Sequence, residues 1–348
     1  MAAATTAALA LFAYGRDARA ASPVSFVRYQ VGDGGEGIAL SARRDDVFVV
    51  QGFWRRDLIG RIRRVNPDCE ILVYQNLSRT AVPRRLGRHN TAITRADALA
   101  HGWDSGVPDA QEPWLHIVEP NDARGYGRFA LRRMAKKLKN SERAGHRVDG
   151  IFLDGVNSFA PSAVGGDPTS SEAIWNGWMG QVNAIVGPGL RKLGYEVMAN
   201  LSGSIAERNL ESGGWEERQF RHFTYVFDEH FAYWADGAPQ LQLYVDEAFR
   251  LTSVARRAGT VYVASVPDGG DEAKATFGLA MLLIQSPGRV AKAPGHGDGE
   301  PWYPVYDRAR TLGRPVRPPV SPSPGVWERR FRGGSVKVDL SNRTATIR

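Results

Sequence analysis

The sequence predicts a (β/α)8 barrel, and three observations lead to this prediction. Eight short segments rich in β-branched and aromatic residues alternate with segments whose apolar residues recur at helical spacing. Several of the short segments are apolar almost throughout, as expected for a parallel sheet that is buried on both faces. The chain has 348 residues, a length that suits one such barrel.

The predicted strands share an apolar run bounded by polar residues or glycine. They are Ser25–Tyr29, Asp46–Phe53, Glu70–Asn76, Gly150–Asp154, Glu196–Asn200, Tyr225–Phe231, Thr260–Ser265 and the shorter Arg289–Lys292. A doubly wound sheet is the alternative, and it would favour a G-x-G-x-x-G loop before a helix. The glycine-rich stretch Val31–Gly37 lacks this spacing, so we interpret it as a loop after the first strand.

Helical periodicity is clearest in Gly127–Asn140. Phe129, Met134 and Leu138 share one face of this segment, and Lys and Arg occupy the other. The other predicted helices are Ser170–Leu193, Asp246–Ala258 and Glu272–Gln285.

Three regions of the chain differ in composition. Residues 1–21 are expected to be a signal peptide or a flexible tail. Ala2–Tyr14 are small and apolar, and Ala18-Arg19-Ala20 fits a small-x-small cleavage site, although a basic start is lacking. Export is the favoured localisation, so the protein is expected to be secreted or extracytoplasmic, and a cytoplasmic protein is the alternative. Residues 22–312 are assigned to the barrel. No membrane span is predicted in the mature chain, because no other segment reaches about 18 uncharged apolar residues.

Residues 313–348 are expected to form a proline-rich linker followed by a short β appendage. The linker is Gly313–Pro324, and the strands are Trp327–Phe331, Ser335–Leu340 and Thr344–Arg348. The appendage is too short to be stable by itself.

The charge distribution, the histidines and the single cysteine argue against nucleic-acid binding, metal binding and a Ser or Cys nucleophile. The net charge of +8 is spread over the chain as arginine pairs without a nucleic-acid-binding motif, so we expect a solvated surface and no nucleic-acid partner. The histidines lack metal-ligand spacing, so no metal or other cofactor is expected. With a single cysteine, Cys69, and no G-x-S-x-G motif, the sequence disfavours a Ser or Cys nucleophile. Oligomeric state is not predicted.

Carboxylates end two of the predicted strands. The active site of a barrel lies at the C-terminal ends of its strands, where this sequence has Asp154 and the pair Asp228-Glu229. Neighbouring side chains of a strand point in opposite directions, so only one of the pair faces the site, and its longer reach favours Glu229. Asp154 and Glu229 are therefore the predicted catalytic residues. The alternative for Asp154 is a structural role as a turn cap.

Amide and aromatic side chains accompany these acids, as in sugar-binding sites. Aromatic rings stack on the C–H faces of sugars, and amides and carboxylates bind hydroxyl groups. The predicted substrate-binding residues are Trp54, Tyr74, Asn76, Asn157, Asn200, Asp228, Tyr233 and Trp234. For Trp103 and Trp114, substrate contact and packing remain equally open. Two carboxylates suffice to cleave a glycosidic bond.

The runs 148-VDGIFLDGVNS-158, 195-YEVMANLSG-203 and 225-YVFDEHFAYW-234 resemble TIM-barrel glycoside hydrolases of the "hypothetical glycosyl hydrolase family 15" type. This group is distinct from the glucoamylases, and it is distantly similar to the endo-α-1,4-polygalactosaminidases. The tail 328-ERRFRGGSVKVDLSNRTATI-347 resembles the closing β segment of such proteins. The resemblance extends from about Phe26 onward. It implies Asp154 as the nucleophile and Glu229 as the acid/base of a retaining enzyme, and Asp228 beside Glu229 leaves the latter assignment open.

The favoured function is therefore hydrolysis of an oligo- or polysaccharide by two carboxylates, with retention implied by the resemblance. A carbohydrate-binding barrel without catalysis is the alternative, because aromatic and amide side chains alone explain binding. A barrel enzyme acting on a phosphorylated metabolite ranks below both. The stretch Pro267–Gly270 offers glycines, but Asp268 and Asp271 would repel phosphate.

Overall fold

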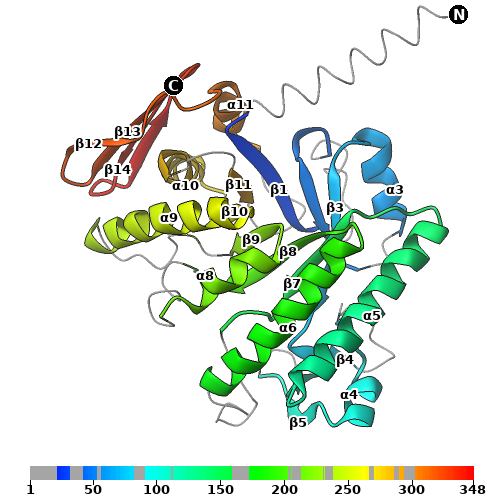
Figure 1. Cartoon of the computed structure of the whole chain (residues 1–348). Coiled ribbons are helices and arrows are strands. Elements are labelled where there is room, and N and C mark those ends of the chain that lie inside the picture. Colours follow the sequence, from blue (N-terminus) through cyan, green and yellow to red (C-terminus); the bar gives the residue numbers. More distant parts are fainter. Residues whose placement is uncertain are drawn as a thin grey trace, which may run out of the picture.

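A computed structural model describes residues 22–31, 42–52, 56–81, 91–110, 113–158, 172–202, 205, 213–229, 231, 238–265, 270–285, 290–293 and 302–348. Eight parallel strands close into a barrel in the order β1-β11-β10-β9-β8-β7-β3-β2, which confirms the predicted fold class (Figure 1). These strands are β1 (Val24–Val31), β2 (Val47–Val50), β3 (Glu70–Asn76), β7 (Gly150–Asp154), β8 (Glu196–Ser202), β9 (Tyr225–Asp228), β10 (Val261–Ser265) and β11 (Val290–Ala293).

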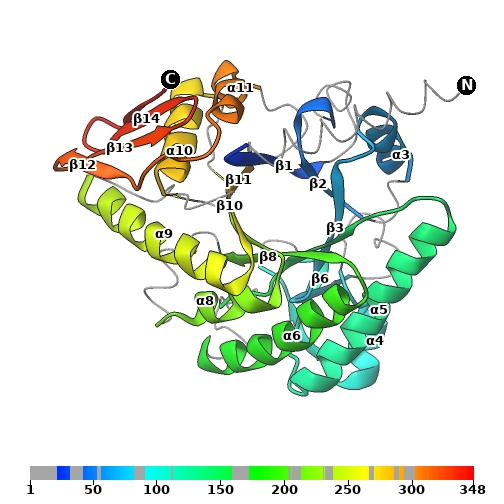
Figure 2. The ribbon, with the colours of Figure 1, turned by 45° about the horizontal axis from the view of Figure 1, so that its top comes forward.

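Helices cover the outside of the barrel (Figures 1 and 2). They are α3 (Arg56–Val65), α5 (Ala123–Arg143), α6 (Glu172–Lys192), α8 (Trp215–Gln219), α9 (Ala238–Ala258), α10 (Glu272–Gln285) and α11 (Pro304–Thr311), with a 3-10 turn at Phe220–His222. The prediction of α10 is confirmed, whereas α5 and α9 begin earlier than predicted. The side chain of Asp122 accepts a hydrogen bond from the Gly125 amide at 3.0 Å and so caps the start of α5.

The barrel interior is apolar below the C-terminal ends of its strands. Side chains alternate along each strand, so Val27, Val49 and Leu72 point inward while their neighbours pack against the helices. Above them the rings of Tyr29, Phe152 and Phe227 meet with centroids 4.9–5.4 Å apart. This aromatic layer closes the interior, so that polar side chains at the strand ends rest on a dry floor.

An insertion follows β3 directly. It holds the three-stranded sheet of β4 (Arg79–Ala81), β5 (Asp104–Pro108) and β6 (Leu115–Val118), together with α4 (Arg95–His101). A Thr94–Asp97 capping box begins α4, and Gly102 ends it in the left-handed conformation. The sheet joins the barrel where the Val118 amide donates to the Ser78 carbonyl at 2.9 Å.

The C-terminal residues form an antiparallel sheet of four strands. They are β12 (Val320–Ser323), β13 (Val326–Phe331), β14 (Gly334–Asp339) and β15 (Thr344–Ile347). The predicted linker Gly313–Pro324 was wrong in part, because it contains β12. This strand lies at the edge of the sheet with all its residues exposed, and an edge strand tolerates a proline such as Pro322.

The C-terminal sheet packs on α9 and α10, on the side of the barrel away from α5 and α6 (Figures 1 and 2). The Trp327 ring meets that of Phe249 at 5.3 Å, and its indole donates to Gln242 at 3.2 Å. Arg329 is buried and donates to the carbonyls of Leu283 and Ile284 at 3.1 Å each. These contacts join the sheet to the barrel as one packed body.

The predicted export segment, residues 1–21, lies outside the described residues. Within the part of the chain that the structure describes, no helix combines the length and apolarity needed to cross a membrane.

Replacing Gly150 with alanine should destabilise the barrel. A Cβ at this position would lie 1.9 Å from the backbone oxygen of Glu196 on the neighbouring strand, so β7 and β8 would have to separate. We expect Gly150→Ala to lower the free energy of unfolding by roughly 1–3 kcal/mol or more, measured by urea denaturation. Gly177→Ala on the exposed face of α6, where nothing lies within 4 Å, is the control and should stabilise slightly. Equal stability of the two variants would contradict this packing.

Candidate active site

The candidate site lies at the C-terminal ends of β3, β7, β8 and β9. Asn76 at the end of β3 is in register with Asp154 at the end of β7. In the barrel β8 lies between β7 and β9, so Asn200 stands between Asp154 and Glu229, the residue that follows β9. Inward alternation brings these side chains together with Tyr74 above the aromatic floor.

Asp154 accepts hydrogen bonds from four donors. Its Oδ2 accepts from the Tyr74 hydroxyl and from Asn76 Nδ2 at 3.3 Å. Its Oδ1 accepts from Asn200 Nδ2 at 3.1 Å and from the Gly155 amide at 2.9 Å. Three of these donors are amide N–H groups, which cannot accept a hydrogen bond from the O–H of a carboxylic acid. The arrangement therefore fits a carboxylate that acts as an acceptor with both oxygens.

The Tyr74 hydroxyl is a permanent donor to Asp154. Burial, followed by the negative charge of Asp154 and the hydrogen bond to it, raises the pKa of Tyr74 well above its ordinary value. The ring of Tyr74 stacks on Phe152 with centroids 5.8 Å apart, which fixes its direction. Packing on the aromatic floor thus positions the Tyr74 hydroxyl, and this hydroxyl in turn positions the Asp154 carboxylate.

Asn200 connects the two acids. Its Nδ2 donates to Asp154 at 3.1 Å and to Glu229 Oε2 at 2.9 Å. Because one nitrogen contacts both, the two carboxylate oxygens lie no more than about 6 Å apart. A bulge helps to place the amide, since Asn200 pairs with Phe227 whereas Ser202 pairs with Asp228. Asn200 is 4% exposed, and both acids are half-buried.

A second set of contacts orients Asn76 and Asp154. Ser78 donates to Asn76 Oδ1 from its amide at 2.9 Å and from its hydroxyl at 3.1 Å. The oxygen of the Asn76 amide is thereby turned toward Ser78, and its NH2 group toward Asp154. Gly155 packs so closely on Ser78 that a Cβ would lie 2.1 Å from its Oγ, and its φ of +64° is left-handed. The sequence analysis missed Ser78 and Gly155, although an Asn-x-Ser turn after β3 and a glycine after Asp154 were signals of both.

Asp228 requires a correction. It was predicted to contact the substrate, but it is fully buried and points to the helix side of β9. There it accepts a hydrogen bond from the Tyr262 hydroxyl of β10, whose pKa is raised well above its ordinary value by burial and by the charge of Asp228. Alternation along β9 is the physical reason, because it directs Glu229 inward and Asp228 outward. Asp228 thus ties β9 to β10 behind the site.

The other predicted residues have mixed placements. Trp54, Tyr233 and Trp234 lie outside the described residues. Asn157 follows β7, and its backbone carbonyl accepts a hydrogen bond from the Trp175 indole at 3.0 Å. Trp103 is buried against the rings of His101 and Tyr126, so packing explains it, whereas Trp114 is 39% exposed.

The described residues include no group of three or more His, Cys, Asp or Glu that could hold a metal ion. At this rim the described residues contribute two carboxyl groups and the donors that position them. One carboxylate has four donors around it, and the second stands across a shared amide, which is an arrangement suited to acid–base and nucleophilic chemistry at one bond.

Gly155→Ala tests how Asp154 is placed. The added Cβ would collide with Ser78, and relief of the contact must move the end of β7. We expect turnover to fall by at least about 10²-fold, because a displacement of about 1 Å in a reacting group costs this much. The control is Gly145→Ala, which has a similar φ of +77° but nothing within 4 Å. Full activity of Gly155→Ala, measured beside the control at equal folded fraction, would contradict the proposed placement.

Comparisons with solved structures show weak likeness. Aspergillus fumigatus Ega3 in complex with galactosamine is 10% identical, with a TM-score of 0.39 over 73% of this chain and 80% of that one. The cyclic alpha-maltosyl-(1→6)-maltose hydrolase from Arthrobacter globiformis is 12% identical, with a TM-score of 0.43 over 91% of each chain. The gamma-CGTase from alkalophilic Bacillus clarkii is 11% identical, with a TM-score of 0.49 over 92% of this chain and 62% of that one.

No curated protein matches the chain. A protein family does match, over residues 63–335, a span that runs from α3 through the barrel into the C-terminal sheet and includes both acids of the site. Its description is hypothetical glycosyl hydrolase family 15. The chain belongs to this family and is a glycoside hydrolase.

Proposed function

We propose that the protein cleaves glycosidic bonds of an oligo- or polysaccharide with retention of configuration, using Asp154 as the nucleophile and Glu229 as the acid/base. The family establishes hydrolysis of carbohydrates. The observation that supports the mechanism is the single amide nitrogen of Asn200 that donates to both carboxylates.

The spacing of the carboxylates favours retention. Retaining glycosidases hold the two groups roughly 5–5.5 Å apart. Inverting ones hold them roughly 6.5–9.5 Å apart, because a water must fit between the general base and the anomeric carbon. The shared amide limits the distance between the two oxygens that it contacts, one from each acid, to about 6 Å. If the two N–H bonds of the amide, about 120° apart, each point at one oxygen, the oxygens lie ~5 Å apart.

Asp154 suits the role of the nucleophile. Donors occupy both of its oxygens, so the carboxylate is fixed in direction before a sugar arrives. Tyr74 and Asn76, which were predicted to bind substrate, are assigned here to positioning this carboxylate, because their polar groups are directed at Asp154. Asn200 is left to bridge the acids and to contact a hydroxyl of the bound sugar.

Glu229 acts as acid and then as base. In the first step the proton of Glu229 passes to the glycosidic oxygen. The bond between this oxygen and the anomeric carbon breaks, and an Asp154 oxygen forms a bond to the anomeric carbon. In the second step Glu229 takes a proton from water, the water oxygen bonds to the anomeric carbon, and the bond to Asp154 breaks. Each step inverts the anomeric carbon, so the product retains the configuration of the substrate.

A screen against α- and β-linked polysaccharides tests this proposal. Asp154→Asn and Glu229→Gln should each reduce the release of reducing ends by at least about 10³-fold, since each removes a group that acts on the reacting atoms. Both substitutions keep the size of the side chain, and thermal denaturation should show an intact fold. Asp307→Asn, an exposed acid in α11, is the control and should keep full activity.

Turnover that survives in Asp154→Asn would contradict the proposal, and Asp154 would then be a structural cap. Inverted configuration in the first product, followed by NMR, would contradict the retaining mechanism and leave the two-carboxylate site in place.

A further inference from the structure

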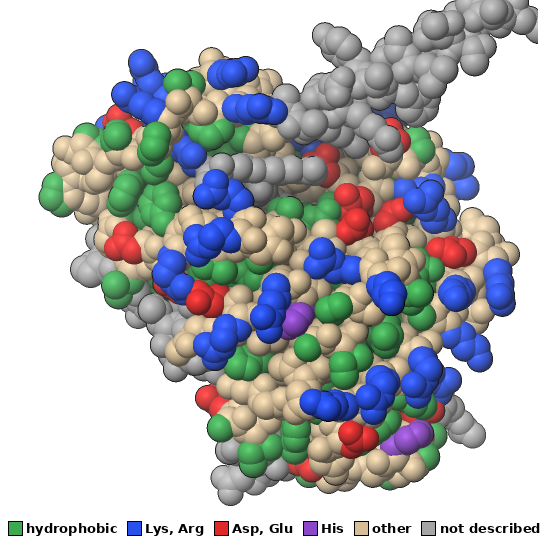
Figure 3. Space-filling view, viewed as in Figure 1, with side chains coloured by type: hydrophobic (Ala, Val, Ile, Leu, Met, Phe, Trp, Pro, Cys, Tyr) green, Lys and Arg blue, Asp and Glu red, His purple; other side chains and the backbone are tan. Residues whose placement is uncertain are grey.

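The C-terminal sheet has a second face that does not pack on the barrel. Along β13 and β14, Trp327, Arg329, Phe331, Val336 and Val338 point toward the helices and the core. Alternation sends the residues between them to the opposite side, where most are exposed. Space-filling shows Lys and Arg side chains gathered over this part of the molecule, at the upper left of Figure 3.

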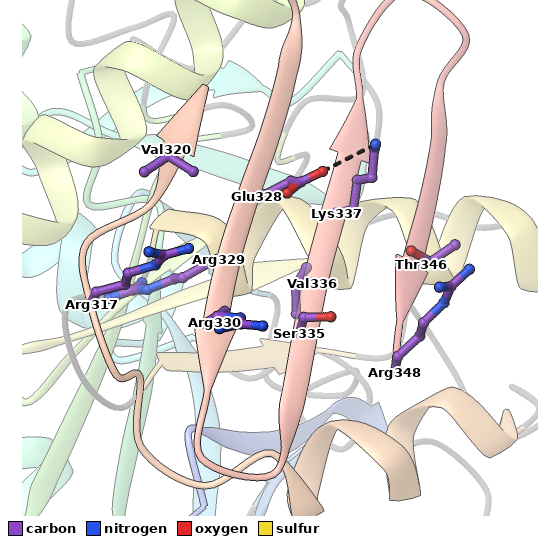
Figure 4. A pocket seen from close by; sticks show the side chains of 10 residues that line it. All are labelled: Arg317, Val320, Glu328, Arg329, Arg330, Ser335, Val336, Lys337, Thr346 and Arg348. Carbon is purple, nitrogen blue, oxygen red and sulfur yellow. Dashed lines mark ion pairs between the residues drawn. The ribbon is translucent and has the colours of Figure 1, made fainter. Parts of the chain in front are cut away.

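A hollow of about 430 Å³ lies on this side of the sheet (Figure 4). Its polar lining includes Arg317, Arg330, Ser335, Lys337 and Arg348, which we call the outer basic face. Glu328 is its acidic member, and it pairs with Lys337 at 3.1 Å. Among the residues that the structure describes, no acid pairs with Arg317, Arg330 or Arg348. Within the described part of the chain, these three guanidinium groups thus have no carboxylate within salt-bridge distance, and an anion bound beside them would offset their charge.

Strand register arranges the donors in a row. Ser335 of β14 is opposite Arg330 of β13, and the backbone of Ser335 exchanges hydrogen bonds of 2.9 Å with that of Arg348 beside it. Figure 4 shows Arg330 on β13, Ser335 on β14 and Arg348 at the end of the adjacent β15. Neighbouring strands lie ~4.8 Å apart, so two arginine side chains leave the backbone on either side of Ser335 across about 10 Å. A guanidinium fork and a hydroxyl are matched donors for carboxylate oxygens.

We propose that the outer basic face binds an acidic polysaccharide through its carboxylate groups, at a site separate from the catalytic carboxylates. The proposal rests on the glycoside hydrolase function, because that function makes a polysaccharide the expected polymer. Among the described residues that line the hollow, no side chain is aromatic, so recognition by them depends on charge and not on stacking. Single-stranded nucleic acid, whose bases bind by stacking on aromatic rings, fits this lining less well.

Binding of polygalacturonate, a linear polymer with one carboxylate per sugar, tests the proposal by affinity electrophoresis. The parent is Glu229→Gln, so that the polymer is not degraded during the measurement. Arg330→Gln with Arg348→Gln should weaken binding by about tenfold at low salt, and salt should weaken binding by the parent more steeply. Arg256→Gln with Arg257→Gln, which removes the same charge from the exposed last turn of α9, should leave binding unchanged.

Three results would overturn the proposal. The first is equal binding of polygalacturonate by the Arg330/Arg348 variant and the parent. The second is binding of the neutral polymer dextran by the parent as strongly as polygalacturonate. The third is equal affinity of the parent for duplex DNA and polygalacturonate, which would make this face a general polyanion or nucleic-acid surface. Hydrolysis by the wild type is measured separately, so the two hypotheses fail independently. Hydrolysis without polygalacturonate binding overturns only this inference, whereas binding without hydrolysis overturns only the proposed mechanism.

Discussion

The contact of one Asn200 amide with two carboxylates is the interaction on which the rest of the site depends. When both acids are ionised they repel each other at this separation, and the positive end of an amide dipole between them lowers that repulsion. The barrel makes the contact possible, because β8 lies between β7 and β9 and a bulge after Asn200 adjusts the pairing with β9. The geometry of the candidate site is thus a consequence of strand order in a closed sheet.

Core residues far away in the sequence help to position the two acids. Tyr29, Phe152 and Phe227 form a floor, Tyr74 stacks on Phe152, and the Tyr74 hydroxyl fixes Asp154. On the far side of the sheet, Asp228 and Tyr262 tie β9 to β10 next to Glu229. Both acids therefore stand on strand ends that are anchored from inside and outside the barrel.

Much of this arrangement was predictable, for a physical reason. Apolar periodicity reports burial on both faces of a parallel sheet, so the eight strands, α10 and the inward choice of Glu229 followed from the sequence. The insertion with β4, β5, β6 and α4 did not, because short elements with mixed burial lack a clear period. The linker prediction failed at β12, since proline marks both linkers and edge strands. The shared Asn200 amide depends on side-chain distances that no local pattern encodes.

Covalent trapping of the sugar tests the central claim most directly. Glu229→Gln slows hydrolysis of the covalent glycosyl-enzyme. This intermediate should therefore accumulate when the substrate has a leaving group that departs without protonation. Intact mass spectrometry and peptide mapping then locate the sugar. The account predicts one glycosyl unit on Asp154, and no adduct in a chain that also carries Asp154→Asn. A sugar attached to another carboxylate, or turnover without any adduct and with inverted product, would contradict it.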